Sequence, residues 1–417
     1  MYAKFPVPGP RPAEAGGSRP GFRSRPRRVA LVSHTNSFYG AGRSLLDLVR
    51  CLLREGLDVG VALPAGGLLG HKLLEQRCTV WNRALPAWVH QSGLPNPGLS
   101  AAVFDAAAAD LQHCLADWGA DLLWSNSTIT PVGALAAERM GIPHVWHLRE
   151  LNGSPHGFEF GLGTDEAARL VRTASRRVAV SRTVRNYYEN LGCGKCEWVY
   201  NGIDSAARLA VRQRRRAQPA GPVRLLMVGR IAPVKEQRIA IEATSHLHRA
   251  GYAVELRVVG GGDAESCRRH ANALGIGSRV EFTGFSESPE QHYRWADIAL
   301  SCCRIEAMGR STAEAMSWGL PIAGHGAAGT GELVGDAGGG LLYHGGGENL
   351  AEIVAALIDD PAAATAKGAA GQQWARRHVS NERHAQRIRE IVMSLAEPEV
   401  DTPIRARPAV QLAVSAV

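Results

Sequence analysis

The sequence lacks the hydrophobic segments that membrane insertion or secretion would require. No run of about 18 apolar residues occurs anywhere, and the N-terminal stretch has no apolar core of the kind that a signal peptide carries. The 417 residues are 45% hydrophobic and 21% charged, which is typical of globular proteins and sufficient for two domains of ordinary size. We therefore expect a cytoplasmic protein with two folded halves.

Motifs that would indicate a bound metal or dinucleotide are also missing. The chain has no Asp-x-Asp, and its eight cysteines include a single CxxC, Cys193 to Cys196, without the second pair that a zinc site needs. Gly260-Gly-Gly262 follows an apolar run, but Glu265 stands where the third glycine of G-x-G-x-x-G would be. We expect no metal, no cofactor and no disulfide, and we interpret the three glycines as a closely packed βα turn.

Basic residues outnumber acidic ones and give a net charge of +8, with clusters at residues 23–28, 172–185 and 212–216. Such clusters can attract nucleic acid, an anionic lipid surface or a phosphorylated substrate, although most charge clusters are solvated surface. No interleaved aromatics and no helix-turn-helix pattern accompany them, so we expect no nucleic-acid partner. Loose peripheral contact with the inner face of a membrane stays open, although the sequence shows no amphipathic anchor.

Short apolar strands alternate with helical patterns in both halves of the chain. This alternation predicts an α/β protein with two doubly wound parallel sheets, each covered on both faces. The predicted strands of the first half are 29–33, 59–63, 121–124, 144–147 and 177–180; those of the second half are 223–228, 255–259, 280–282, 298–300 and 321–323.

The segment from Ile305 to Pro321 carries the most specific signal. It places Glu306 and Glu314 eight positions apart across Gly309. At about 100° per residue, a helix that begins after Gly309 would hold Glu314 in its early turns and leave Glu306 in the preceding loop. A helix start offers free N–H groups and a positive dipole end to an anion, and carboxylates accept hydrogen bonds from sugar hydroxyls. The segment therefore favours a nucleotide-sugar ligand over two merely solvated glutamates.

This segment resembles the Glu-x7-Glu signature of retaining GT-B glycosyltransferases of glycosyltransferase family 4. Ala307 and Met308 depart from the usual Gly and aromatic residue. A second segment, Gly229-Arg230 to Lys235, resembles the family's Gly-Arg-(four residues)-Lys, and residues 328–332 resemble its Gly-Gly-x-x-Glu. The positions of the first segment that match in register are Gly309, Glu314, Ala315, Met316, Gly319 and Pro321.

The resemblance implies roles for individual residues. Arg230 and Lys235 would neutralise a diphosphate, Glu314 would accept hydrogen bonds from ribose hydroxyls, and Glu306 would lie near the transferred sugar. His147, which ends a predicted strand, would also approach that sugar, although a lone histidine is as often structural. The remaining donor-site residues that the resemblance implies are Gly40, Gly42, Gly229, Phe285, Ala307, Met308, Gly309 and Arg310.

The resemblance also implies a domain organisation with two Rossmann-like domains facing a cleft. The first would bind the acceptor and the second the nucleotide sugar, and a C-terminal helix would return to the first domain. The segments in order are a disordered tail (1–27), the first domain (28–205), a linker (206–222), the second domain (223–371), the returning helix (372–396) and a flexible tail (397–417).

The implied activity is a metal-independent transfer of a hexose from a nucleoside diphosphate sugar, on family frequency a UDP-sugar, with retention of configuration. The acceptor would be a glycan, a lipid-linked glycan or a natural product; Phe38, Tyr39, Trp88, Trp124 and Trp146 are candidate contacts to it. Alternatives are a sugar-nucleotide epimerase of the same architecture, a nicotinamide oxidoreductase, which the missing fingerprint disfavours, and a nucleotide- or membrane-binding protein without activity.

Overall fold

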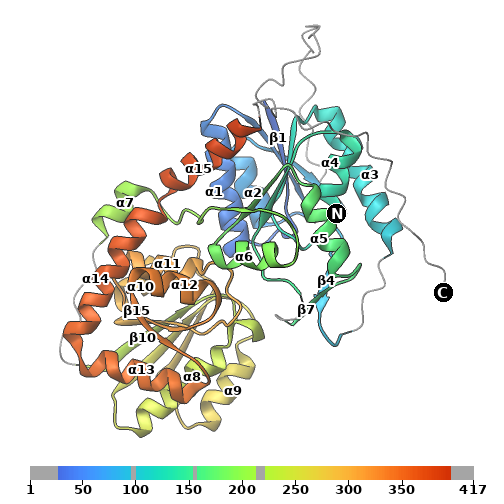
Figure 1. Ribbon diagram of the computed structural model, residues 1–417. Helices are drawn as coiled ribbons and strands as arrows, with labels where there is room; N and C mark the ends of the chain where they lie inside the picture. The colour runs from blue at the N-terminus through green and yellow to red at the C-terminus, as the bar shows by residue number, and fades with distance from the viewer. Residues whose placement is uncertain (1–26, 95–99, 154–156, 213–220, 396–417) are drawn as a thin grey trace.

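The chain folds into two lobes, each built on a parallel sheet with helices on both faces (Figure 1). The computed structural model describes residues 27–94, 100–153, 157–212 and 221–395. Of the two predicted tails, 1–27 and 397–417, only Arg27 lies within the described residues. The predicted fold class is confirmed.

The first lobe contains a seven-stranded parallel sheet in the order β3-β2-β1-β5-β6-β8-β9. Its central strands are almost entirely buried, as their continuous apolar sequences predict. The strands are β1 (Arg28–Val32), β2 (Asp58–Leu63), β3 (Thr79–Asn82), β5 (Leu122–Ser125), β6 (His144–Leu148), β8 (Arg176–Ala179) and β9 (Glu197–Trp198). The helices are α1 (Gly40–Arg54), α2 (Leu68–Glu75), α3 (Ala101–Trp118), α4 (Val132–Met140), α5 (Thr164–Thr173) and α6 (Arg182–Asn190). A short antiparallel ribbon pairs β4 (Val89–Gln91) with β7 (Phe158–Phe160).

The second lobe repeats this design with a six-stranded parallel sheet in the order β12-β11-β10-β13-β14-β15. The strands are β10 (Val223–Val228), β11 (Val254–Val259), β12 (Val280–Gly284), β13 (Ile298–Ser301), β14 (Ile322–His325) and β15 (Gly340–Tyr343). The helices are η2 (Pro233–Lys235), α8 (Gln237–Arg249), α9 (Glu265–Ala273), η3 (Gly277–Arg279), α10 (Glu290–Trp295), α11 (Arg310–Ser317), α12 (Ala328–Ala337) and α13 (Gly347–Asp359). All ten strands that the sequence predicts are present in the two sheets.

The strand orders locate the ligand site. Each order reverses direction beside its first strand, between β1 and β5 in the first lobe and between β10 and β13 in the second. In open parallel sheets a ligand lies beyond the carboxyl ends of the strands at such a reversal. The loops after β1, β10 and β13 are therefore the expected walls of a site.

The predicted C-terminal helix 372–396 is in fact two helices. α14 (Pro361–His378) belongs to the second lobe, and α15 (Asn381–Ser394) packs on the first lobe beside α1. The break has a local cause, because the Ser380 side chain accepts a hydrogen bond from the backbone N–H of Arg383 and so caps α15. The chain thus crosses to the first lobe at residues 379–381, and only α15 makes the predicted return.

The predicted linker 206–222 is partly helical, and the first crossing between the lobes lies before it. α7 (Ala206–Val211) packs against α14, where the Arg376 guanidinium donates to the carbonyl oxygens of Leu209 and Ala210. The crossing segment 201–205 runs beside the returning segment 379–381, since Asn381 N–H donates to the carbonyl of Asp204 at 2.8 Å. Residues 213–220 lie outside the described part of the chain.

Two buried histidines predict that acid destabilises the fold. Burial lowers the pKa of His144 from 6.5 to about 3 and that of His384 to about 4, and each ring is hydrogen-bonded, to Ser125 Oγ and to the carbonyl of Tyr200. The unfolded chain binds these protons below pH 6.5 and the folded chain does not, so the stabilisation is complete above pH 6.5 and is lost as pH falls towards the folded pKa values.

We expect the free energy of unfolding to fall by about 1.4 kcal/mol per histidine for each pH unit below the unfolded pKa. Urea unfolding of the wild type and of His384→Gln at pH 7 and pH 5 measures this loss. The variant should show a flatter pH dependence, whereas His113→Gln, at an exposed position, should match the wild type. Equal pH dependences for all three proteins would contradict the assignment.

Candidate nucleotide-sugar site

A cavity of about 480 Å³ lies between the lobes where the two strand orders reverse. The first lobe contributes the loop after β1, the start of α1 and the residues after β6, and the second contributes the loops after β10, β11 and β13 with the start of α11. The predicted site residues that line this cavity are Gly40, Gly229, Arg230, Lys235, Phe285, Glu306, Ala307, Met308, Gly309, Arg310 and Glu314.

Gly309 ends the loop that holds Glu306 and begins α11. Its φ of +88° lies in the left-handed region, which glycine adopts without strain. No side chain caps the helix, so the N–H groups of its first turn, which start at Arg310, face the cavity without a capping oxygen. The helix start and the two glutamates are therefore arranged as the spacing predicts.

Lys235 and Glu306 meet across the second-lobe wall of the cavity. Lys235 Nζ lies 2.5 Å from Glu306 Oε2, and both side chains are partly buried. Burial by itself lowers the pKa of Lys235, but Glu306 and Cys303 outweigh it and leave that pKa above its usual value. Lys235 is therefore charged at neutral pH, with two N–H groups beyond the one given to Glu306. Arg230 adds a second cation at the exposed rim of the cavity.

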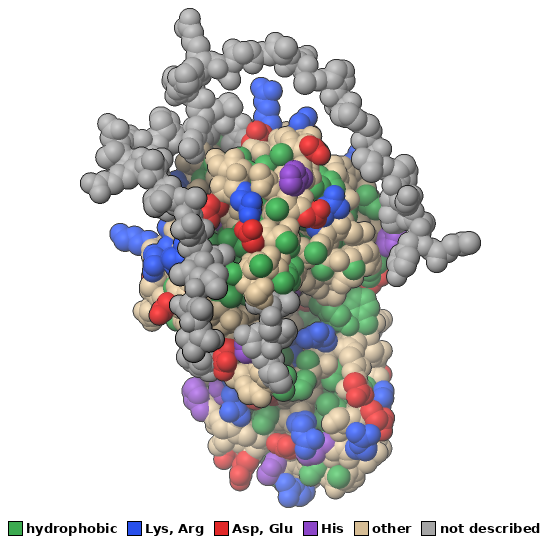
Figure 2. Space-filling view, turned by 90° about the vertical axis from the view of Figure 1, so that its right-hand side faces the viewer, with side chains coloured by type: hydrophobic (Ala, Val, Ile, Leu, Met, Phe, Trp, Pro, Cys, Tyr) green, Lys and Arg blue, Asp and Glu red, His purple; other side chains and the backbone are tan. Residues whose placement is uncertain are grey.

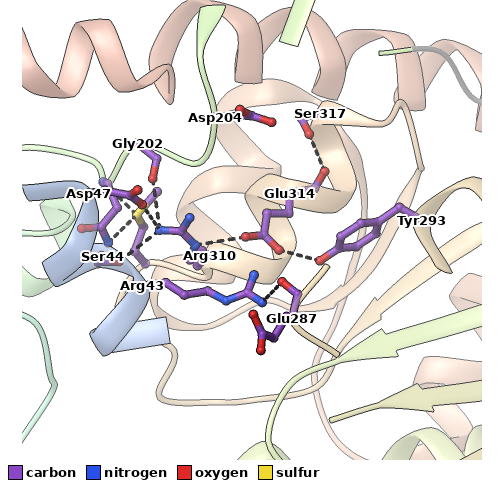
Figure 3. Close-up of polar contacts among 12 residues, drawn as sticks. Arg43, Ser44, Asp47, Gly202, Asp204, Glu287, Tyr293, Arg310, Glu314 and Ser317 are labelled. Carbon is purple, nitrogen blue, oxygen red and sulfur yellow. Dashed lines mark hydrogen bonds and ion pairs between the residues drawn. The ribbon is translucent and has the colours of Figure 1, made fainter. Parts of the chain in front are cut away.

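Glu314 is held on two sides by neighbouring side chains (Figure 3). Its Oε1 accepts from Arg310 Nε at 3.0 Å, and its Oε2 accepts from the Tyr293 hydroxyl at 2.9 Å. An ionised carboxylate has about four acceptor positions, so each oxygen keeps one for a ligand hydroxyl. The side chain is only 12% exposed, and its orientation is fixed before any ligand enters.

Two predicted site residues do not reach the cavity. His147 is fully buried against Trp124, and Arg149 Nη2 lies 3.2 Å from its Nδ1. Burial, Arg149 and His384 all lower the pKa of His147, so the ring is neutral and faces away from the site. Gly42 is also buried, where an added Cβ would lie 2.1 Å from the Ser37 carbonyl oxygen, and so it allows close packing of α1 on the preceding loop.

Of the aromatic residues proposed as acceptor contacts, only Phe38 and Tyr39 line the cavity. Tyr39 meets Phe285 of the other lobe edge-to-face, with ring centroids 5.3 Å apart. The three tryptophans, Trp88, Trp124 and Trp146, belong to the first-lobe core. Trp124 and Trp146 lie on strands that are buried on both faces, where an aromatic side chain packs into the core. The sequence of such a strand does not distinguish a core aromatic residue from one that contacts a ligand.

The polar wall of the first lobe was missed by the sequence reasoning. His34, Arg149 and Glu150 line the cavity from the loops after β1 and β6. Glu150 is oriented by Ser127 Oγ at 2.9 Å and by the Thr128 N–H at 3.2 Å. Their position after β1 and β6, two strands of one parallel sheet with only β5 between them, was the available signal, because the carboxyl ends of parallel strands meet at one edge.

Gly329, in the segment that resembles Gly-Gly-x-x-Glu, supports the loop that carries Glu306. Its N–H donates to the Glu306 carbonyl at 2.7 Å, and an added Cβ would lie 2.6 Å from the Ala307 carbonyl oxygen. Gly329→Ala should therefore displace this loop, destabilise the protein by about 1–3 kcal/mol and weaken ligand binding in the cavity. Thermal unfolding with and without a nucleoside diphosphate measures both effects.

The matched control is Gly335→Ala in the same helix, where an added Cβ meets nothing within 4 Å. It should leave ligand protection at the wild-type level and should not destabilise the protein, since Gly→Ala at an exposed position inside a helix adds about 0.5–1 kcal/mol of stability. Equal behaviour of the two alanine variants would show that the close contact at Gly329 does not constrain the loop.

Neither a metal cluster nor a membrane-spanning helix is found in the described parts of the chain. There, no group of three or more His, Cys, Asp or Glu side chains is placed to hold an ion. Over the same residues, none of the helices combines the length and the apolar character needed to cross a bilayer. Figure 2 shows Lys and Arg side chains interspersed with Asp and Glu on the face that it draws.

Two facing Rossmann-like lobes with a cavity between them define the GT-B fold. Solved structures agree: HepE of Anabaena, in a structure described as a complex with UDP-glucose, superposes with a TM-score of 0.73 at 22% identity, over 88% of this chain and 99% of that one. The family model described as Glycosyltransferase Family 4 matches residues 38–207, and that described as Glycosyl transferases group 1 matches residues 212–374. The chain belongs to glycosyltransferase family 4.

Curated relatives match parts of the chain. A GDP-mannose-dependent alpha-(1-6)-phosphatidylinositol monomannoside mannosyltransferase of Mycobacterium tuberculosis (strain CDC 1551 / Oshkosh) is 31% identical over 182 residues, 41% of this chain and 47% of the relative. A 2-deoxystreptamine glucosyltransferase of Streptomyces kanamyceticus is 36% identical over 161 residues, 38% of this chain and 41% of the relative. The matched part of the chain thus spans about half the length of these relatives.

Proposed function

We propose that the protein is a retaining glycosyltransferase that moves a hexose from a nucleoside diphosphate sugar to an acceptor hydroxyl. The observation that carries this proposal is the cavity itself, which brings together the cations Arg230 and Lys235, the uncapped start of α11 and the carboxylate Glu314. Positive groups suit a diphosphate, and a carboxylate with free acceptor positions suits the ribose diol.

In the proposed reaction the acceptor oxygen attacks the anomeric carbon while the bond from that carbon to the diphosphate oxygen breaks. The attack occurs on the face that the diphosphate leaves, so the configuration is retained, and the acceptor proton passes to the leaving phosphate oxygen. Arg230, Lys235 and the α11 N–H groups stabilise the charge that builds on the diphosphate. No side chain is then required as a base, and His147 is not among the residues that line the cavity.

The acceptor would lie against the first-lobe wall, where Glu150 and His34 face the cavity. Burial lowers the pKa of His34, with Glu150 raising and Arg149 lowering it, so the ring is neutral near pH 7 and can hydrogen-bond a hydroxyl. The two relatives are named for phosphatidylinositol monomannoside and for 2-deoxystreptamine, and a glycan, a lipid-linked glycan or a natural product is the acceptor class that we propose. Loose contact with a membrane surface stays a prediction.

A screen of UDP-, GDP- and TDP-sugars for protection against thermal unfolding tests the donor proposal. We expect a UDP-sugar to protect, since a ligand at 100 times its dissociation constant adds about 2.7 kcal/mol of stability. One relative is named as GDP-mannose-dependent. Protection by a GDP-sugar alone would therefore replace UDP by GDP as the proposed donor nucleotide and leave the proposed reaction as it is. Protection by none of the three would contradict the proposed function.

Transfer is expected to be independent of added metal, because side chains and a helix start supply the positive charge at the diphosphate. Donor turnover should be unchanged by EDTA. A loss of activity in EDTA that manganese restores would overturn this part of the mechanism.

A further inference from the structure

Arg310 joins the two lobes directly behind the carboxylate that is proposed to read the ribose. Its Nη1 lies 3.0 Å from Asp47 Oδ2 on α1 of the first lobe, while its Nε lies 3.0 Å from Glu314 Oε1 on its own helix (Figure 3). Nη1 also donates to the carbonyl of Gly202 at 3.2 Å and to Ser44 Oγ at 3.3 Å. One guanidinium thus contacts the first lobe with one end and Glu314 with the other.

The three charged side chains of this contact are sheltered from water. Asp47, Arg310 and Glu314 are 14%, 15% and 12% exposed, so their interactions are less screened than those of surface ion pairs. Burial lowers the pKa of Arg310, but Asp47 and Glu314 outweigh it, and the guanidinium is charged. The positive charge of Arg310 is therefore shared between one carboxylate from each lobe.

Because Arg310 is shared between two carboxylates, more hydrogen-bond acceptor positions of Glu314 stay available to a ligand. An arginine with a single carboxylate partner tends to bind it with two parallel hydrogen bonds, one to each oxygen. Here Nη1 is held by Asp47, and Glu314 accepts a hydrogen bond from Nε. The donor beside Nε on the same edge of a guanidinium is Nη2. Without Asp47, the guanidinium is free to shift, to bring Nη2 onto Glu314 as well and to occupy the acceptor positions that ribose hydroxyls would take.

A second contact on the same face of α1 holds that helix against the second lobe. The Arg43 guanidinium, one turn before Asp47, donates to the carbonyl oxygens of Ser286, at 3.2 Å, and Glu287. Both contacts require the lobes to be as close together as they are in this structure. The orientation of Glu314 is therefore tied to closure of the lobes.

We propose that Asp47 is a positioning residue for the donor: through Arg310 it holds Glu314 ready for the ribose hydroxyls, so that the nucleoside is read fully only when the lobes are closed. This inference rests on the proposed function, because it assumes that a nucleoside diphosphate occupies the cavity. It adds a residue of the first lobe, remote in sequence from both glutamates, to the recognition of the donor.

Calorimetric titration of the full chain with UDP and GDP, and with the 2′,3′-dideoxy analogue of each, tests this proposal. Asp47→Asn should weaken binding of the ordinary nucleotide about tenfold, in the range of coupling between contacting residues, and leave the dideoxy analogue nearly unaffected. A merely structural role would weaken both ligands alike. Asp105→Asn, which breaks an ion pair with Arg139 within the first lobe, is the matched control and should affect neither ligand.

The outcomes separate this inference from the proposed function. If the wild type binds neither UDP nor GDP, the proposed function fails and the inference fails with it. If the wild type binds but Asp47→Asn weakens the ordinary and dideoxy nucleotides equally, or neither of them, only the inference is overturned. Should Asp47→Asn fail to fold, Asp47→Glu is the second variant, because it keeps the charge but misplaces it. Asp47→Glu must then lower the ratio of the affinity for the ordinary nucleotide to that for the dideoxy nucleotide. An unchanged ratio would overturn the proposal.

Discussion

Lys235→Ala is expected to lower the turnover number of the proposed transfer by about 10²–10³-fold, the usual cost of removing one preorganised donor to a developing charge. Lys235 is a partly buried cation of the cavity, and its pKa is raised above the usual value, so it carries its charge at every pH at which the reaction would be assayed. Release of the nucleoside diphosphate at saturating donor measures the effect. We therefore expect no loss of activity from deprotonation of Lys235 at pH values below the ordinary pKa of lysine.

Two further variants separate the role of Lys235 from that of its partner. Lys195→Ala removes an exposed first-lobe lysine and should behave as the wild type. In Lys235→Ala the Glu306 carboxylate loses its counterion and would repel a diphosphate, so Lys235→Ala/Glu306→Gln removes that repulsion. Full recovery in the double variant would show that Lys235 only neutralises Glu306. That result, or a single variant within twofold of wild type, would contradict the proposed role.

Glu314→Ala is expected to remove about half or more of the thermal protection given by the donor nucleotide at 100 times the wild-type dissociation constant. The variant removes the carboxylate that Arg310 and Tyr293 orient, and with it the acceptor positions proposed for the ribose. Hydrogen bonds to a charged group contribute about 1.5–3 kcal/mol, which corresponds to roughly 10- to 150-fold in the dissociation constant. The shift in the unfolding midpoint with increasing UDP or GDP measures the loss.

Glu348→Ala is the control for this variant, since it removes an exposed carboxylate in the first turn of another helix of the same lobe, α13. It should keep the protection of the wild type. Removal of Glu314 also leaves Arg310 with less counter-charge, so the midpoint without ligand is recorded for each protein. Undiminished protection of Glu314→Ala would remove this carboxylate from the proposed site.

The strands and the start of α11 could be predicted because their signals are local. Continuous apolar runs indicate strands buried on both faces, and Gly309, eight residues after β13 ends at Ser301, marks a loop that turns into a helix. The break between α14 and α15 had a local signal as well, since Ser380 followed by Glu382 is typical of a helix N-terminus. The sequence interpretation overlooked it.

His147 shows where local reasoning fails. Alternate residues of a strand point to opposite faces, but β6 is buried on both, so its sequence does not reveal which face looks onto the cavity. The structure turns His147 towards α15, where burial and His384 lower its pKa, and leaves Arg149 and Glu150 at the end of the strand to line the cavity. The contact of Asp47 with Arg310 joins residues that are 263 apart in sequence, and no pattern within either segment indicates it.

A crystal structure of the protein with UDP or GDP, whichever raises the unfolding midpoint, tests the central claim most directly. We predict the diphosphate within hydrogen-bonding distance of Lys235 Nζ, the Arg230 guanidinium and the first N–H groups of α11, with the ribose hydroxyls on the Glu314 carboxylate. A nucleotide bound outside the cavity between the lobes, or bound there with its ribose turned away from Glu314, would contradict the account.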